Sequence, residues 1–61
     1  MGKKYILVKD NKVVNEKISD DLDLAKSYFT TWLKELGFNG TYDILEGEDI
    51  QSAEKVASLN I

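Results

Sequence analysis

Residues 4–18 of the chain read KYILVKDNKVVNEKI, and this stretch predicts the β-hairpin around which the other elements are arranged. Two runs rich in β-branched and aromatic residues flank Asp10 and Asn11, and these residue types tolerate the positive φ of a two-residue turn. In the simplest register the numbers of opposing residues sum to 21. The predicted pairs are then Val8 with Val13, Leu7 with Val14 and Tyr5 with Glu16.

The predicted hairpin has apolar side chains on both faces. One face carries Tyr5, Leu7, Val14 and Ile18. The other face carries Ile6, Val8 and Val13. A solvated face of an antiparallel sheet should be polar instead. The second face is therefore predicted to need a cover. We expect self-association of two copies, in a homodimer, through Ile6, Val8 and Val13, and the alternative is coverage by the short C-terminal helix.

Residues 19–38, SDDLDLAKSYFTTWLKELGF, predict one amphipathic helix. Ser19 or Asp20 can cap its first N–H groups, and Gly37 supplies the left-handed residue that often ends a helix. On a wheel of 100° per residue, one arc of this helix is apolar. The arc consists of Leu22, Ala25, Tyr28, Phe29, Trp32, Leu33 and Leu36. Phe29 and Trp32 are predicted to be core residues rather than ligand-stacking residues.

The last third of the chain predicts a third strand, at about residues 41–45, and then a short second helix. Asp49 would be the N-cap of that helix. Its buried side would carry Ile50, Ala53 and Val56 or Ala57. A fourth strand is the alternative for the same segment, because Ala57, Leu59 and Ile61 alternate with other residues in the way that a strand requires.

These elements predict one α+β domain over residues 1–61, with the order ββαβ followed by a short C-terminal helix. A small antiparallel or mixed three-stranded sheet packs on one amphipathic helix. The crossover from the second strand through the helix to the third strand should be right-handed. The first strand then lies between the other two, in the order 2-1-3.

Composition argues against catalysis and against a bound cofactor or metal. The 61 residues include no Cys and no His. This removes thiolate zinc sites, the commonest general base and the commonest metal ligand. None of the Ser or Thr residues can have a His to activate it, and there is no Gly-rich phosphate loop. We therefore expect a protein that is not an enzyme and that has no cofactor.

Charge is distributed unevenly along the chain, whose net charge is −3. Residues 1–18 have a charge of +3, and residues 19–61 have a charge of −6. All eight basic residues are Lys, so the bidentate Arg fork that favours phosphate and guanine recognition is absent. Nucleic-acid binding is disfavoured for this reason. No hydrophobic run is long enough to span a membrane, and a cytoplasmic location is expected.

Six acidic residues are predicted to share one end of the domain. If the second and third strands are parallel, both end where the helix begins. We call the set the acidic pole; it consists of Asp20, Asp21, Asp23, Glu46, Glu48 and Asp49. Such a cluster attracts basic partners and can imitate a phosphate backbone. The competing interpretation is that the acids only cap helix N-termini and maintain solubility.

The same region includes residues 43–54, whose two ends fit the pattern of a calcium-binding loop. With Asp43 at the first position of an EF-hand loop, Glu54 falls at the twelfth. Leu45 and Gly47 then occupy two ligand positions, and Glu48 stands where Gly is required. A calcium site is therefore not predicted.

The sequence is most typical of a small, acidic, non-catalytic protein-interaction module, an adaptor or inhibitor that binds a larger protein, of the kind that phages and mobile elements encode. A second candidate surface is a stripe along the helix, beside its apolar arc. We call it the helix stripe; it consists of Leu24, Tyr28, Thr31 and Glu35. The alternatives are a nucleic-acid-mimicking inhibitor that uses the acidic pole, a nucleic-acid binder that uses the Lys-rich hairpin, and a structural subunit of a particle.

Overall fold

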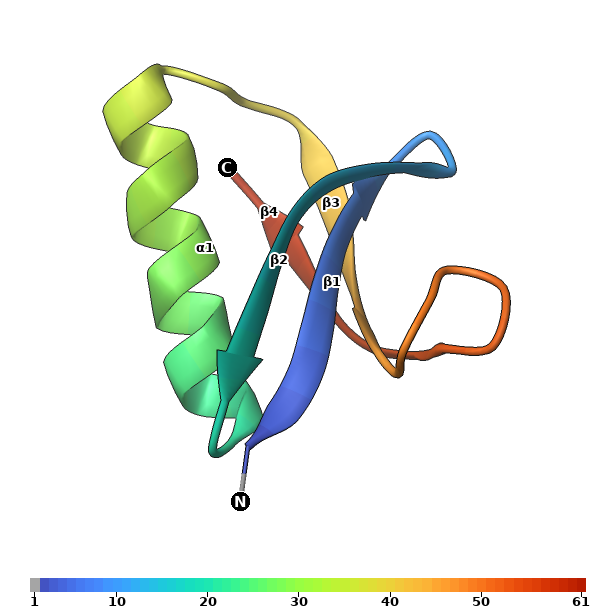
Figure 1. Ribbon diagram of the computed structural model, residues 1–61. Coiled ribbons are helices and arrows are strands. Elements are labelled where there is room, and N and C mark those ends of the chain that lie inside the picture. The colour runs from blue at the N-terminus through green and yellow to red at the C-terminus, as the bar shows by residue number, and fades with distance from the viewer. Residues whose placement is uncertain (1) are drawn as a thin grey trace.

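The computed structural model describes residues 2–61, which form a four-stranded antiparallel sheet with one helix on one of its faces (Figure 1). The elements in chain order are β1 Lys3–Lys9, β2 Lys12–Ser19, α1 Leu22–Leu36, β3 Thr41–Glu46 and β4 Glu54–Asn60. The fold is therefore α+β, as predicted, although its sheet has one strand more than predicted and residues 2–61 contain one helix instead of two.

The strand order is β2-β1-β3-β4. Both β2 and β3 are antiparallel to β1, so they run in the same direction on either side of it. The predicted order 2-1-3 is confirmed for the first three strands. The additional strand, β4, is antiparallel to β3 and lies on its outer side.

The predicted second helix is wrong, and the alternative of a fourth strand is correct. The capping signal at Asp49 is real, because its carboxylate accepts from the N–H of Ser52 at 2.9 Å and its carbonyl accepts from Ala53 N–H at 2.9 Å. This makes one turn between strands, after which the chain is extended. The alternation of apolar residues favours a strand here, because a strand places Ala57 and Leu59 together on the face that α1 covers. Leu59 is buried there.

The hairpin turn is confirmed, whereas its register is only partly as predicted. Asp10 and Asn11 have φ values of 53° and 63°, and Val8 pairs with Val13. A β-bulge then shifts the register by one residue, so that Leu7 pairs with Asn15 and Tyr5 with Lys17. The predicted pairs of Leu7 with Val14 and Tyr5 with Glu16 are wrong.

Val14 is the extra residue of this bulge, and its side chain packs against the core beneath α1. Because one residue is inserted, every later residue of β2 changes face. Ile18 therefore pairs with Lys4 on the face away from α1 and is 68% exposed. The prediction that Ile18 shares a face with Tyr5 and Leu7 is wrong for this reason.

The helix begins and ends close to the predicted positions. Asp21, rather than Ser19 or Asp20, is the N-cap, and its Oδ1 accepts from Leu24 N–H at 2.9 Å. Gly37 has φ 77° at the C-terminal end, where Phe38 N–H donates to Leu33 O at 3.0 Å. This is the Schellman pattern, which positions Phe38 against the last turns of the helix.

The core between α1 and the sheet is built from apolar residues of the helix and of strands β1, β3 and β4. Its buried members are Tyr5, Leu7, Ala25, Phe29, Leu33, Tyr42, Ile44 and Leu59. Trp32 and Leu22 are partly buried against this cluster. Tyr28 and Leu36, which the helical wheel assigned to the same arc, are exposed. The helix therefore buries a narrower stripe than the sequence pattern predicts.

The face of the sheet opposite α1 is largely closed by the chain itself. Ile6 is 1% exposed and Val8 is also buried, whereas Val13 remains exposed. Glu16 and Leu45 flank Ile6 on the neighbouring strands, and the loop after β3 projects on this side of the sheet (Figure 1). Because the chain itself covers Ile6 and Val8, the main reason for predicting self-association through this face is removed.

Phe29→Ala is expected to lower the free energy of unfolding by about 3–5 kcal/mol, because it leaves a cavity at a fully buried position. Total stability for a chain of this size is roughly 3–9 kcal/mol. Urea denaturation followed by Trp32 fluorescence measures the change. The control, Leu36→Ala on an exposed position of the same helix, should stay within about 0.5 kcal/mol of the parent. Equal effects of the two variants would contradict this packing of α1.

Candidate functional site

The outer surface of α1 carries two exposed apolar side chains one turn apart. Leu24 is 56% exposed and Tyr28 is 39% exposed. Thr31 and Glu35 follow on the same surface and are exposed as well. All four residues of the helix stripe therefore reach solvent along one side of a single helix.

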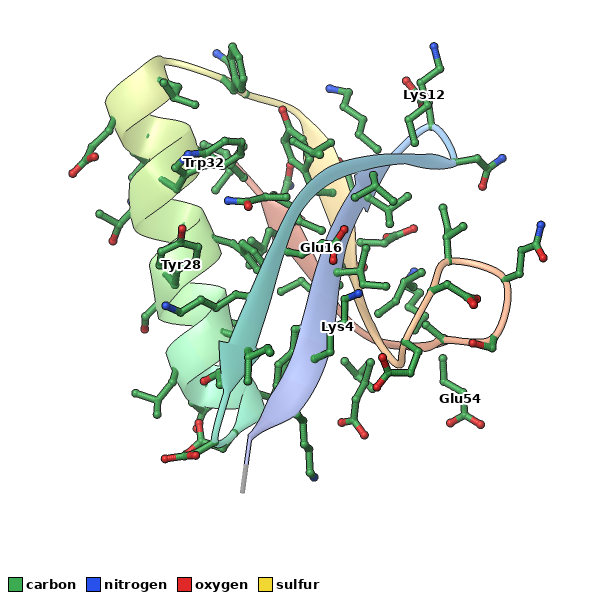
Figure 2. The ribbon with its side chains drawn as sticks, in the orientation of Figure 1. Lys4, Lys12, Glu16, Tyr28, Trp32 and Glu54 are labelled. Atoms are coloured by element: carbon green, nitrogen blue, oxygen red, sulfur yellow. The ribbon has the colours of Figure 1, made fainter. Side chains whose placement is uncertain are left out.

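An open hollow of about 440 Å³ lies on this surface. It is lined by Ser27, Tyr28, Thr31, Trp32 and Glu35. Three of the four residues of the helix stripe are among its walls, while Leu24 lies one turn before it. Figure 2 shows Tyr28 and Trp32 as neighbours along α1. Their spacing of four residues places the two aromatic rings on one face of the helix.

The aromatic walls are held by contacts with neighbouring residues. The ring of Trp32 meets that of Phe38 edge to face at 6.3 Å, and the ring of Tyr28 meets that of buried Phe29 in the same way at 5.6 Å. The ammonium of Lys17 lies 4.6 Å from the centre of the Tyr28 ring. These contacts restrict the rings, and a restricted side chain loses less entropy if its surface becomes covered.

Trp32 takes part in both the core and the surface of the domain. It packs against the core, as predicted, and it also lines the hollow. The sequence contained a signal for the second role, because Tyr28 and Trp32 are separated by one turn and stand at the edge of the apolar arc. Wheel analysis assigns such border residues to the core, because it cannot show how far the sheet extends beneath them.

A second hollow, of about 410 Å³, lies at the C-terminal end of α1 and was not predicted. It is lined by Lys9, Val14, Gly37, Phe38, Asn39 and Tyr42. The ammonium of Lys9 donates to Asn39 O at 3.3 Å and lies 4.9 Å from the centre of the Tyr42 ring. Since Phe38 lines this hollow and contacts Trp32, which lines the other, the two hollows adjoin one aromatic pair.

The six residues of the acidic pole lie at one end of the sheet, as their placement in the sequence predicts. Lys3 of β1 pairs with Ser19, immediately before Asp20, and Tyr5 pairs with Glu46. The sheet divides the set, however. Asp21 and Asp23 belong to the start of α1, whereas the loop that contains Glu48 and Asp49 projects on the opposite side (Figure 1).

Several acids of this set already serve the fold. Asp21 is the N-cap of α1. Asp49 accepts hydrogen bonds from Ser52 N–H, Ser52 Oγ and Gln51 N–H, at 2.9, 2.9 and 3.1 Å. These bonds, with those of Ser52 the largest cause, lower the pKa of the Asp49 carboxyl. Local capping therefore accounts for part of the acidic pole.

Lys4 stands among the acids on the face away from α1. Its ammonium pairs with Glu16 at 2.9 Å and donates to Glu48 O at 2.9 Å (Figure 2). The Glu16 bond, together with the charges of Glu16, Glu48 and Asp49, raises the pKa of Lys4 against the opposing effect of desolvation. This cation weakens the negative field of the acidic pole.

Three of the five lysines of the hairpin are engaged within the fold. Lys4 is paired with Glu16, Lys9 lies over Tyr42, and Lys17 lies over Tyr28. Lys4 and Lys17 come from opposite faces of the sheet, because their β-strand partners are Ile18 and Tyr5 respectively. A contiguous row of free ammonium groups, which phosphate binding needs, is therefore not built by these three lysines.

Within residues 2–61, no three acidic side chains come close enough together to hold a metal ion. In the same part of the chain, no helix has the length and apolar character needed to cross a membrane. No protein-family model, curated protein or solved structure matches the chain.

The Asp49 carboxyl is expected to titrate below the ordinary pKa of 3.8, because Ser52 and Gln51 bond its ionised form. A lowered folded-state pKa contributes stability that is present above the unfolded pKa and is lost as the pH falls through the folded pKa. Carbon-detected NMR titration measures the midpoint directly.

Ser52→Ala removes one donor to Asp49 and should raise that midpoint. The control is Ser58→Ala, whose hydroxyl donates to Asp43 instead and which should leave the Asp49 midpoint unchanged. An Asp49 midpoint at or above the ordinary value, or one that ignores Ser52→Ala, would show that the capping turn does not form in solution.

Proposed function

We propose that the chain is a small non-catalytic protein-binding module, an adaptor or inhibitor whose docking surface is the outer face of α1. One observation carries the proposal. The exposed residues Leu24 and Tyr28 continue directly into the hollow whose walls include Trp32. Tyr and Trp are the residue types that most often dominate binding energy at protein interfaces.

The chemistry of the hollow favours binding over catalysis. Its polar groups are the hydroxyls of Ser27 and Thr31 and the carboxylate of Glu35. A hydroxyl needs an adjacent base to become a nucleophile, and the chain contains no His. Hydroxyls and a carboxylate around aromatic walls instead match the polar rim and apolar centre of a protein interface.

The energetics also favour a partner at this surface. Leu24 has no place in the core, and burying a leucine side chain fully is worth roughly 1.5–3 kcal/mol. Tyr28 and Trp32 are already restrained by their neighbours, so their immobilisation costs little. A helix face or loop of a larger protein that covers Leu24 and fills the hollow would gain from both effects.

A second candidate is docking of a basic partner, or imitation of a nucleic acid, by the acidic pole. The observation that favours it is the exposure of Asp20 and Asp23 beside the start of α1, with a net charge of −3 for the whole chain. The engagement of Asp21, Asp49 and Lys4 within the fold argues against it. Salt separates the two candidates, since charge-driven docking weakens with ionic strength.

The double variant Leu24→Ser with Tyr28→Ala is expected to reduce partner binding at least tenfold, a loss of about 1.4 kcal/mol, and to leave the circular dichroism spectrum unchanged. Partners are captured from an extract of the native source by the immobilised chain, and their affinities are then measured by calorimetry. Ile18→Ser is the matched control, because Ile18 is exposed and apolar on a different face.

The measurement is repeated between about 0.05 and 0.5 M salt. Binding through α1 should change little over this range. A partner that binds the double variant normally, but is lost with Asp20→Asn and Asp23→Asn or at high salt, would assign docking to the acidic pole. That result would contradict the proposal.

A further inference from the structure

The outer edge of β4 is unpaired within residues 2–61, because β4 has β3 as its neighbour on one side only. Ile61 N–H donates to Gly40 O at 2.9 Å, and Gly40 N–H donates to Ile61 O at 3.1 Å. Bonding alternates along an antiparallel strand, so Leu59 also bonds toward β3, opposite Tyr42. The backbone N–H and C=O groups of Ser58 and Asn60 therefore point away from the sheet.

The sequence along this edge lacks the features that usually prevent strands from pairing. Residues 56–61 read VASLNI, with no charge and no Pro. Exposed edges are normally protected by charged residues, Pro or bulges. A bulge is present only at Val56, near the start of β4, where the register with β3 shifts. Residues 57–61 beyond it form a regular strand end.

The opposite edge of the sheet, β2, is protected. It carries Lys12, Glu16 and Lys17 and has a bulge within its length. The N–H of Glu16 already donates to Asn15 Oδ1, at 2.8 Å. The two edges of one sheet therefore differ, and β4 is the edge that remains free to accept a strand.

We propose that β4 pairs antiparallel with β4 of a second copy of this chain, about a two-fold axis at Leu59, to form one continuous sheet across the dimer. Ser58 would lie opposite the partner's Asn60, and Ala57 opposite the partner's Ile61. Each Ser58–Asn60 pair would exchange two backbone hydrogen bonds. This edge is distinct from the sheet face of Ile6, Val8 and Val13, through which the sequence predicts self-association.

A second copy fits this edge because the edge is self-complementary. Segment 57–61 has no charged side chain, so the two-fold register brings no like-charged side chains of this segment together. The polar side chains of Ser58 and Asn60 share the face away from α1. The segment also lies away from the acidic pole, because β4 begins beside Glu46 and runs toward the opposite end of the sheet. The negative ends of the two copies are thus kept apart.

The same operation on β2 would bring like charges together. After the bulge, the residues of β2 whose backbone N–H and C=O groups point away from β1 are Glu16 and Ile18. Pairing Glu16 with Ile18 of a second copy sets Lys17 opposite the partner's Lys17, and pairing about Glu16 sets two glutamates opposite each other. Like charges directly opposite one another destabilise a strand pair. This contrast assigns the second copy to β4.

The interface is small, so the dissociation constant should be about 0.1–1 mM. Amide hydrogen exchange by NMR is compared at about 0.05 and 1 mM protein, together with sedimentation equilibrium. The N–H groups of Ser58 and Asn60 should exchange about two- to threefold more slowly at the higher concentration. A strict monomer at the higher concentration, or a dimer that leaves these two N–H groups unprotected, would overturn the proposal.

Ser58→Pro removes an outward N–H and leaves the backbone bonds between β4 and β3 in place, although it also removes the hydroxyl that donates to Asp43. Edge strands accept Pro at such positions. This variant should be monomeric with an unchanged circular dichroism spectrum. Ile18→Pro makes the same change on the β2 edge and should still associate. Association that survives Ser58→Pro, or that Ile18→Pro abolishes in a folded protein, would contradict pairing through β4.

A charge-swap pair of variants keeps the test decisive if Ser58→Pro fails to fold. Ser58→Lys with Asn60→Lys places lysines opposite each other in the dimer, and Ser58→Glu with Asn60→Glu does the same with glutamates. Each double variant should be monomeric alone, and an equimolar mixture should associate. Failure of the folded mixture to associate would exclude this register.

Discussion

The burial of β1 on both faces is the constraint on which the rest of the structure depends. Tyr5, Ile6, Leu7 and Val8 are all buried, although a chain of 61 residues has little material with which to cover them. One helix closes the side of Tyr5 and Leu7. On the other side, side chains of the neighbouring strands flank Ile6, and the loop after β3 projects over the same face (Figure 1). The fold satisfies this demand without a second helix.

This constraint also separates structural residues from those that are free to act. Phe29 and Leu33 are fully used in closing the sheet, whereas Leu24 and Tyr28 contribute little to it and remain exposed on α1. An exposed apolar residue alone means little. Here the exposed residues adjoin a hollow with a partly buried tryptophan, so apolar side chains that the core does not use are concentrated on one surface. The acidic pole is different, because several of its members stabilise turns or pair with Lys4.

Local signals in the sequence predicted the local structure well. Asp10 and Asn11 form the turn, Gly37 ends the helix, and the order of the first three strands follows from the right-handed crossover. The bulge at Val14 could not be predicted, because no residue type marks it and it depends on the core cluster against which Val14 packs. Segment 54–60 was ambiguous, since Asp49 gave a true capping signal while the alternation of Ala57 and Leu59 required a strand. The hollow beside Trp32 depends on how far the sheet extends under α1, which a helical wheel does not contain.

The central claim is that a single chain buries both faces of β1, and paired truncations test it most directly. Ile6→Ala and Leu7→Ala change neighbouring residues that point to opposite faces of the sheet. Urea denaturation should show that each variant loses about 2–5 kcal/mol of unfolding free energy. If Ile6→Ala stayed within about 0.5 kcal/mol of the parent while Leu7→Ala was strongly destabilised, the face away from α1 would be open to water, and the account would be contradicted.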